Sequence, residues 1–377
     1  MSDQCAPRNP VRIVTASSLF DGHDAAINIM RRIMQSQGAE VIHLGHNRSV
    51  QEVVDAAIEE DAQGVAVSSY QGGHVEYFEY LVELLREAGA GHIKVFGGGG
   101  GVIVPDEIAR LRACGVQIFS PEDGQRLGLP GMIAQVVSTC DVDVYADRAP
   151  AAADLIAGER AAVARAITGA EQGRLAPELI TELSAAAERR AVPVLGITGT
   201  GGSGKSSLTD ELVRRLRVDQ QDKLRIACVA IDPTRRRGGG ALLGDRIRMN
   251  ALDGDRVFFR SMATRGGREV PEGLREVITI LKASGADLVI IETPGIGQGD
   301  AAIFLPWFME LPFDPYALRD ARLRAAGRIA TFRLNLPLDP RSRTCPSTHR
   351  RFVTSSSFCT SCWTPRRSSP GCRVMPT

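Results

Sequence analysis

The octapeptide "GTGGSGKS", residues 199–206, constrains the fold of this chain more than any other feature. It fits the pattern Gly-x-x-x-x-Gly-Lys-Ser and stands between the apolar run "VPVLGI" and the helix-like run "SLTDELVRRLR". Because lysine is scarce in this chain, a chance match is on the order of one in two hundred. A glycine loop between a strand and a helix presents its backbone N–H groups to phosphate. We therefore predict a P-loop and a nucleotide-binding domain.

The P-loop residues have separate predicted roles. The backbone amides of the loop would cradle the phosphates, Lys205 would reach the outer ones, and Ser206 would hold magnesium. The predicted cradle comprises Gly202, Ser203, Gly204, Lys205, Ser206 and Ser207. Two buried-strand patterns downstream end in carboxylates, Asp232 in "RIACVAIDPT" and Glu292 in "DLVIIETPGIGQ". Carboxylates at strand ends near a P-loop are placed to receive a magnesium ion and its waters.

The first part of the chain, residues 11 to about 138, alternates five short β-branched runs with five helix-like segments. The predicted helices begin near Asp24, Ser49, Val75, Pro105 and Gly124. Ser49 with Glu52 predicts a capping box, and Pro105 predicts a helix start. This alternation favours a doubly wound parallel sheet. If the strand order is the flavodoxin-like 2-1-3-4-5, ligands bind outside the carboxyl ends of strands one, three and four.

Three unusual loops follow those strands. The first, "FDGHD", places His23 beside Asp21. The second, "VSSYQGGH", carries Ser68 and Ser69, and the third is a run of glycines, residues 97–101. A neutral imidazole can coordinate a metal through one ring nitrogen while the other donates its proton to a carboxylate. We predict a site there for a large ligand with a metal, since glycines allow close approach to the backbone.

The segments "DGHDAA", "VSSYQGG" and "VFGGGGGVI" resemble the cobalamin-binding domain of adenosylcobalamin-dependent acyl-CoA mutases. Ala26 replaces a glycine of that family's pattern, and Tyr70 replaces a leucine. The resemblance implies that His23 is the lower cobalt ligand, that Asp21 orients it, and that the cofactor's nucleotide tail enters a slot beside the sheet. The residues implied to line the slot are Ser68, Ser69, Gly97, Gly98, Gly99, Gly100 and Gly101.

The segments "DPT", "GDRIRMN" and "ETPGIGQ" resemble the small G proteins that act as chaperones of cobalamin mutases. The resemblance implies catalytic roles for Lys205 and Glu292 and places Arg248 near the nucleotide. The implied magnesium contacts are Ser206, the Ile231 backbone, Asp232, Asp245, Glu292 and Thr293. Together, the two resemblances indicate an acyl-CoA mutase fused to its G-protein chaperone. They imply adenosylcobalamin, GTP and Mg²⁺ as cofactors, and an acyl-CoA substrate and a homodimer in the complete enzyme.

We therefore predict a flavodoxin-like (Rossmann-type) cobalamin-binding domain over residues 1–140, a helical linker over 141–191 and an incomplete P-loop α/β domain over 192–302. Residues 303–377 contain arginine, serine and proline without sustained periodicity, and no Asn-Lys-x-Asp motif follows the P-loop. We predict that this tail is disordered, and we hypothesise a frame-shifted reading of a GC-rich gene. As written, the chain is expected to have no mutase turnover alone.

Other functions stay open from the sequence alone. One alternative is a cobalamin carrier that is regulated by a P-loop domain. The other is a P-loop kinase or ATPase with a flavodoxin-like scaffold domain. No run of 18 apolar residues and no secretory signal is visible, which predicts a cytoplasmic protein without membrane partners. The arginine-rich tail lacks aromatic residues in alternation, so we expect no nucleic-acid partner. We assign no cofactor role to His43, His46, His74 and His92.

Overall fold

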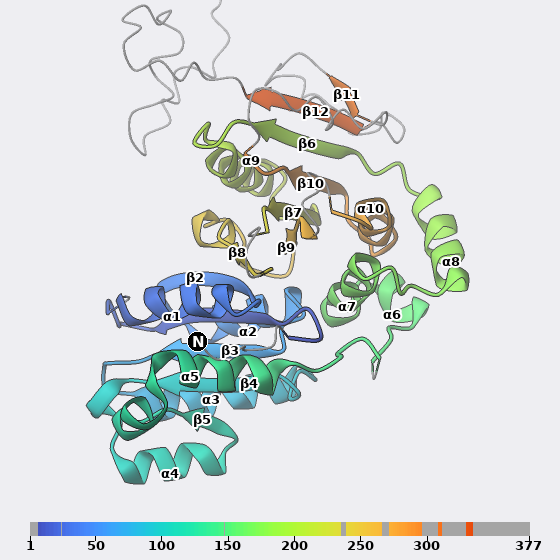
Figure 1. Ribbon diagram of the computed structural model, residues 1–377. Coiled ribbons are helices and arrows are strands. Elements are labelled where there is room, and N and C mark those ends of the chain that lie inside the picture. Colours follow the sequence, from blue (N-terminus) through green and yellow to red (C-terminus); the bar gives the residue numbers. More distant parts are fainter. Residues whose placement is uncertain are drawn as a thin grey trace, which may run out of the picture. The chain divides into compact units, whose positions relative to one another are not determined.

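The computed structural model describes residues 7–23, 25–146, 148–234, 239–265 and 271–295, together with two strands at 308–310 and 329–334. Residues up to 335 form one compact unit, and the second unit, residues 336–377, lies outside the described residues. Two parallel sheets follow one another along the chain (Figure 1). Within the described residues, no helix is both long enough and apolar enough to cross a membrane.

The first sheet confirms the strand order predicted from the sequence. Its strands lie in the order β5-β4-β3-β1-β2, and all neighbouring pairs are parallel. Because the order reverses between β1 and β3, their carboxyl ends form the switch point at which such sheets bind ligands. The elements are β1 (Arg12–Ser18), α1 (Ala25–Ser36), β2 (Glu40–Arg48), α2 (Val50–Glu59), β3 (Gly64–Ser68), α3 (His74–Glu87), β4 (Lys94–Gly98), α4 (Pro105–Ala113), β5 (Val116–Ile118) and α5 (Pro121–Cys140).

Helices cover both faces of this sheet. On one face α2 and α3 bury apolar side chains such as Val53 and Phe78, and on the other α1 buries Met34 against α5. The predicted capping box at the start of α2 is confirmed: the Glu52 carboxylate accepts the Ser49 N–H at 2.8 Å, and the Ser49 hydroxyl accepts the Glu52 N–H at 3.3 Å. With both faces covered, the strand ends are the part of the sheet open to a ligand.

Two features of the first sheet differ from the sequence prediction. Helix α5 starts at Pro121 rather than near Gly124, because Ser120 and Asp123 form a capping box three residues earlier. A sixth strand, β8 (Ala241–Leu243), comes from the later part of the chain and pairs in parallel with β2. A strand of three residues is too short to show a periodic pattern, so periodicity does not predict it.

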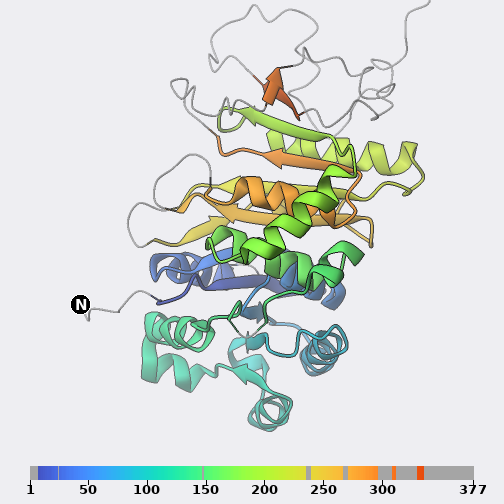
Figure 2. The same ribbon diagram turned by 90° about the vertical axis from the view of Figure 1, so that its right-hand side faces the viewer.

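The second sheet has the order β11-β12-β6-β10-β7-β9, and its pairs are parallel. Figure 2 shows its strands running side by side. The P-loop strand β6 lies between β12 and β10, so the loop that follows it is flanked by other strand ends. The remaining elements are β6 (Val194–Gly199), α9 (Lys205–Asp219), β7 (Ile226–Asp232), η2 (Arg246–Arg248), β9 (Val257–Ala263), α10 (Leu274–Ala283), β10 (Leu288–Glu292), β11 (Phe308–Glu310) and β12 (Ile329–Leu334).

The predicted linker is helical and joins the core of the second sheet. Its helices are α6 (Ala152–Ala157), α7 (Arg160–Glu171) and α8 (Pro177–Glu188). Apolar side chains of α7 and α8, including Ile167 and Leu183, pack in one cluster with Val277 of α10. Within the predicted tail, 303–377, the described residues are the strands β11 and β12, which extend the second sheet. The rest of that segment lies outside the described residues, and its frame-shifted origin stays a prediction.

Candidate functional site

His23 and Asp21 lie on the loop after β1. Asp21 Oδ1 accepts the backbone N–H of His23 at 2.8 Å and lies 2.8 Å from His23 Nδ1. The Asp21 side chain is fully buried, whereas the His23 side chain is 66% exposed. Because Nδ1 faces the carboxylate, the tautomer with hydrogen on Nδ1 is favoured, and Nε2 is the nitrogen left to ligate a metal.

The Asp21 carboxylate is held on both oxygens. Its Oδ2 accepts the backbone N–H of Tyr70 at 2.6 Å. Burial by itself raises the pKa of Asp21, but the N–H groups of Tyr70 and His23 and the His23 ring outweigh it, so the pKa lies below its usual value. The carboxylate therefore stays ionised and fixes the imidazole. The Tyr70 ring also lies near the His23 ring, with centroids 5.8 Å apart and planes tilted by 50°.

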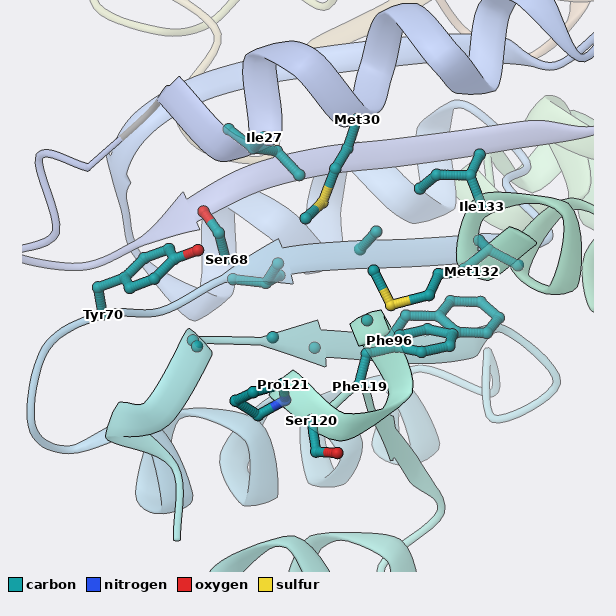
Figure 3. A pocket seen from close by; sticks show the side chains of 18 of the residues that line it. Ile27, Met30, Ser68, Tyr70, Phe96, Phe119, Ser120, Pro121, Met132 and Ile133 are labelled. Carbon is teal, nitrogen blue, oxygen red and sulfur yellow. The ribbon is translucent and has the colours of Figure 1, made fainter. Parts of the chain in front are cut away.

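A cavity of about 200 Å³ lies beside this loop, between the ends of β3 and β4 and the helices α1 and α5. Met30 from α1 and Met132 from α5 reach into it, and Phe96 and Phe119 form part of its wall (Figure 3). The lining is mostly apolar, and Ser68 contributes a hydroxyl that lies 3.0 Å from the Ser17 hydroxyl. Such a wall suits a flat, largely apolar ring.

The glycine run has two different uses. A Cβ on Gly97 would lie 2.5 Å from Phe78 Cζ, and a Cβ on Gly99 would lie 2.0 Å from the Ser69 carbonyl oxygen. These two glycines are therefore required by the packing of the protein itself. Gly98 lines the cavity, and a Cβ there would meet only the Phe119 carbonyl oxygen at 3.8 Å. It is the position where missing side-chain volume serves the cavity.

The structure brings most of the predicted cofactor-binding residues to one place. Ser68 and Gly97 to Gly100 line the cavity, and Asp21 and His23 lie on the neighbouring loop. Ser69 and Gly101 do not line it: Ser69 accepts the Ser18 hydroxyl at 2.8 Å, and Gly101 lies in the short turn after β4. The exposed, oriented imidazole and the adjacent apolar cavity fit a cobalamin whose own base is displaced.

His74 has a carboxylate partner that its sequence context did not reveal. Its Nε2 lies 2.9 Å from Glu107 Oε2, and its Nδ1 lies 3.1 Å from the Gln71 carbonyl oxygen. The ring is buried at the start of α3, and Glu107 belongs to the first turn of α4. Sequence spacing could not place these residues together because they are 33 positions apart. The contact ties two helix starts together and leaves His74 outside the cavity lining.

The P-loop adopts the predicted form between β6 and α9. Gly202 and Gly204 have φ values of 75° and 87°, a left-handed conformation that favours glycine. Lys205 is largely buried, and its Nζ donates to the carbonyls of Gly199 and Thr200 at 3.2 Å each. Burial lowers the pKa of Lys205, although the nearby Glu292 carboxylate acts in the opposite direction. The Lys205 ammonium thus donates to carbonyls of the loop. The negative charge of an outer phosphate bound there would stabilise its positive charge.

Two carboxylates predicted to contact magnesium converge on the hydroxyl of a third predicted contact, Ser206. Ser206 Oγ lies 2.7 Å from Glu292 Oε1 and 3.2 Å from Asp245 Oδ1. A serine hydroxyl has one proton, so it cannot donate fully to both carboxylates. Burial and the nearby Asp245 charge raise the pKa of Glu292. Like-charged carboxylates around one hydroxyl fit a divalent cation, which would accept the oxygen lone pairs.

The other predicted contacts lie around this cluster. Asp232 Oδ2 accepts the Gly244 N–H at 2.9 Å, and burial with the Asp245 charge raises the pKa of Asp232 to about 7. Arg248 is exposed and lies 3.3 Å from Asp245, and Thr293 donates its N–H to the Ile197 carbonyl at 3.0 Å. Ile231 is buried in β7, and Ser207 lies in the first turn of α9. Among the described residues, no group of three or more His, Cys, Asp or Glu side chains forms a complete metal site. Magnesium would therefore depend on phosphate oxygens and waters as well.

Unsatisfied hydroxyls mark the same site. Within the described part of the chain, three buried hydroxyls have no hydrogen-bond partner: those of Thr200 and Ser203 in the P-loop, and that of Thr234, two residues after Asp232. Buried polar groups are rarely left unpaired, and phosphate oxygens are strong acceptors. The residues present therefore fit a bound nucleotide with its cation.

Two residues of this site were not predicted from the sequence. Thr209 is buried one turn after Lys205, and its hydroxyl lies 3.0 Å from Glu292 Oε2 and 3.0 Å from the Lys205 carbonyl oxygen. Gly295 approaches the P-loop so closely that a Cβ would lie 2.7 Å from Gly201 Cα. A polar residue four positions after the P-loop lysine was the available signal for Thr209, while the role of Gly295 depends on a long-range contact.

Two family profiles match the chain in the same order as the two sites. The profile described as "B12 binding domain" matches residues 11–126, and the profile described as "Methylmalonyl Co-A mutase-associated GTPase MeaB" matches residues 163–305. The second match begins inside α7, so it includes helices that the sequence analysis placed in the linker. The fold and sites thus define a class of protein in which a B12-binding domain precedes a MeaB-type GTPase domain.

Relatives with both parts in one chain are more specific. A fused isobutyryl-CoA mutase of Nocardia farcinica is 73% identical over 297 residues, which cover 79% of this chain and 28% of the relative. One of Cupriavidus metallidurans is 65% identical over 300 residues, 79% of this chain and 27% of the relative. The small subunit of a 2-hydroxyisobutanoyl-CoA mutase of Aquincola tertiaricarbonis is 36% identical over 111 residues, 29% of this chain and 79% of that subunit. The chain belongs to the family of the fused isobutyryl-CoA mutases, and it spans little more than a quarter of the length of these two fused relatives.

Proposed function

We propose that this chain supplies the cofactor-binding and GTPase parts of a fused acyl-CoA mutase, which in its complete form converts isobutyryl-CoA to n-butyryl-CoA. The observation that carries the proposal is the exposed imidazole of His23, oriented by the buried Asp21 carboxylate beside an apolar cavity. The acyl-CoA substrate and a homodimeric assembly are proposed for the complete enzyme. Neither a nucleic acid nor a membrane is a proposed partner, and the proposed compartment is the cytoplasm.

The cobalamin part of the proposal assigns a task to each residue. His23 would bind cobalt through Nε2, and Asp21 would hold the proton on Nδ1, which raises the basicity of the ligand. Met30, Phe96 and Phe119 would enclose the cofactor's displaced nucleotide tail in the cavity and exclude water from it. When bound, adenosylcobalamin supplies a carbon radical by homolysis of its cobalt–carbon bond, the chemistry that a carbon-skeleton rearrangement needs.

The GTPase part rests on the P-loop cluster. Lys205 would neutralise the outer phosphates, and Ser206 would help to hold the magnesium ion that accompanies them. Glu292, held in place by Ser206 and Thr209, would accept hydrogen bonds from the water bound to the cation. Arg248, exposed beside Asp245, would contact the nucleotide. Binding and hydrolysis of GTP would then control loading of the cofactor, as a change of ligand state at a site that can take two arrangements.

The test is a spectroscopic titration of the full chain with adenosylcobalamin. We expect tight binding with a base-off absorbance spectrum that His23→Ala alters. The matched control is His46→Ala, because His46 is an exposed histidine on β2 of the same sheet. Absence of binding by the unchanged chain would contradict the proposal and favour the kinase or ATPase class. Equal spectra for both variants would remove His23 from the site.

A further inference from the structure

A segment of the nucleotide-binding part is built into the cobalamin-binding sheet. Strand β8 pairs in parallel with β2, with Ala241 opposite Glu40. The pairing is close: a Cβ on Gly240 would lie 2.2 Å from the Gln35 carbonyl oxygen and 2.6 Å from the Ala39 carbonyl oxygen. Only glycine fits there without displacing the end of α1. The residues around β8 are therefore packed tightly against the first sheet.

Within three residues of β8, the same segment reaches two carboxylates of the nucleotide site, those of Asp232 and Asp245. The Gly244 N–H donates to Asp232 at 2.9 Å, and Asp245 accepts from the Ser206 hydroxyl at 3.2 Å. Both acceptors are carboxylates that the family resemblance implies as magnesium contacts of the proposed GTPase site. A change in their ligands would therefore act directly on residues 244 and 245.

Arg246, the next residue, turns back into the first sheet's helical layer. Its Nη2 donates to Glu59 Oε2 at 2.6 Å, and its Nη1 donates to the Phe259 carbonyl at 3.2 Å. The guanidinium is 8% exposed, and it lies over the Phe259 ring at 5.4 Å. Glu59 is the last residue of α2, and its other oxygen lies 2.9 Å from Arg160. Breaking a buried pair of this kind leaves an uncompensated charge, so Arg246 and α2 are held together.

Further hydrogen bonds join the nucleotide-binding part to the first sheet near Arg246. Glu60, fully buried, accepts the Ser261 N–H at 3.0 Å and the Ser261 hydroxyl at 2.8 Å. Arg265 donates to both oxygens of Glu40 in β2, at 2.6 Å and 2.9 Å. After Glu60 the chain enters β3, whose last residue, Ser68, lines the cavity. Arg246 is therefore connected by buried hydrogen bonds to elements that end at the cofactor site.

The geometry points to residues 240–246 as the connector that couples the two sites. In this account, which rests on the proposed function, the nucleotide and its cation change how Gly244 and Asp245 are held. The change moves β8 and Arg246 together, and β2 and α2 follow. Coupling between two binding equilibria is reciprocal, so the nucleotide state changes cobalamin affinity by the same factor by which cobalamin changes nucleotide affinity.

The test measures that factor on the full chain. Adenosylcobalamin is titrated spectroscopically in the presence of Mg²⁺ with GDP or with a non-hydrolysable GTP analogue. We expect the two dissociation constants to differ by about fivefold or more. Arg246→Met should reduce the ratio to less than about twofold, and Arg246→Lys, which keeps the charge, should retain part of it. The matched control is Arg174→Met, because Arg174 also pairs with a carboxylate, Asp143, and lies over a ring, that of Tyr145.

The outcomes separate the coupling from the function on which it rests. An unchanged chain that binds both ligands but shows a ratio near one overturns the connector, while binding of both ligands still supports the proposed cobalamin and GTP sites. An unchanged ratio in Arg246→Met also overturns it. If the chain binds only one of the ligands, the proposed function itself fails. Should Arg246→Met not fold, hydrogen exchange of the amides of residues 241–243 in the unchanged chain decides: rates that do not differ between the two nucleotide states overturn the connector.

Discussion

The two sites of this chain occupy equivalent places, the carboxyl ends of parallel strands, but differ in their charge balance. In the B12-binding domain the Asp21 carboxylate is satisfied by N–H groups, and its pKa lies below the usual value. In the GTPase domain Asp232, Asp245 and Glu292 crowd together, and burial raises the pKa of Asp232 and of Glu292. The carboxylate of the first site is satisfied within the protein, whereas the crowded carboxylates of the second fit the cation that we propose.

This difference shows that one sheet architecture supports two ways of binding a cofactor. The first site offers shape and one oriented ligand, so its main demand is space for an apolar group. The second offers charge, so its main demand is compensation by phosphate and metal. Substitutions at the first site should therefore impair binding by reducing the volume of the cavity. Substitutions at the second site should impair binding by disturbing its charge balance.

The largest effect is expected at Lys205. Lys205→Ala should weaken binding of Mg²⁺–GTP by about 100-fold, because a charged donor to the phosphates is removed. Cobalamin affinity without nucleotide should stay within about twofold. The measurement is fluorescence titration with a labelled nucleotide, with Arg214→Ala as a control, since Arg214 is an exposed arginine on the same helix. Nucleotide binding or hydrolysis that survives Lys205→Ala would dismiss the P-loop assignment.

Gly98, the last residue of β4, and Gly99, the next residue, allow the shape of the cavity and the stability of the fold to be tested separately. Gly99→Ala should destabilise the fold by about 1–3 kcal/mol, because its Cβ would meet the Ser69 carbonyl oxygen. Gly98→Ala should leave stability nearly unchanged, and Gly98→Leu should lower cobalamin affinity by filling the cavity. Chemical denaturation and cobalamin titration measure the two quantities. Equal stability losses for the two alanine variants would contradict the different uses assigned to these glycines.

Removing one negative charge from the nucleotide site should reduce the repulsion between its carboxylates and stabilise the fold when no magnesium is present. Asp232→Asn keeps an oxygen acceptor for the Gly244 N–H but reduces repulsion with Asp245. In buffer containing EDTA we expect the variant to be more stable than the unchanged chain by about 1 kcal/mol, a rise of a few degrees in Tm. Mg²⁺ with GDP should then stabilise it less than it stabilises the unchanged chain. The exposed Asp253→Asn is the control, and a variant less stable in EDTA would argue against charge crowding.

The smallest effect concerns His92, which lies outside both sites. Burial, together with the nearby Arg148 and Arg165 charges, lowers the pKa of His92 to about 4. The unfolded chain then binds the proton more readily than the folded one, so stability falls as pH decreases from about 6.5 towards 4. His92→Gln should flatten this part of the stability profile, measured by thermal unfolding at several pH values. The same slope in variant and unchanged chain would show that other groups cause it.

The sequence was most informative where chemistry is local. His23 and Asp21 are two positions apart, so their contact follows from one loop, and the P-loop is a contiguous motif. Ser206, Asp245 and Glu292 are distant in sequence. Ser206 lies in the first turn of α9 after the P-loop, Asp245 lies in the glycine-rich segment, and Glu292 ends β10, so the topology brings them to one edge. The strand order predicted for the first sheet brings the three predicted loops to the sheet edge beside which the cavity lies.

The sequence was least informative where packing decides. Strand β8 is too short for a periodic signal, and its partner in the sheet lies about 200 positions earlier in the chain. The buried pair of Arg246 and Glu59 joins two helical segments across 187 positions, and an isolated arginine or glutamate carries no mark of burial. The glycine run suggested close approach of a ligand, whereas Gly97 and Gly99 serve the protein's own packing.

The central claim, that His23 ligates cobalt, is tested most directly by the electron paramagnetic resonance spectrum of Co(II) cobalamin bound to the full chain grown with ¹⁵N. A ¹⁵N ligand from the protein splits each axial line into a doublet, whereas the cofactor's own ¹⁴N base splits it into a triplet. We predict the doublet for the unchanged chain and its loss in His23→Ala. A triplet from the ¹⁵N-labelled chain would contradict the assignment, because the cofactor would then have kept its own base.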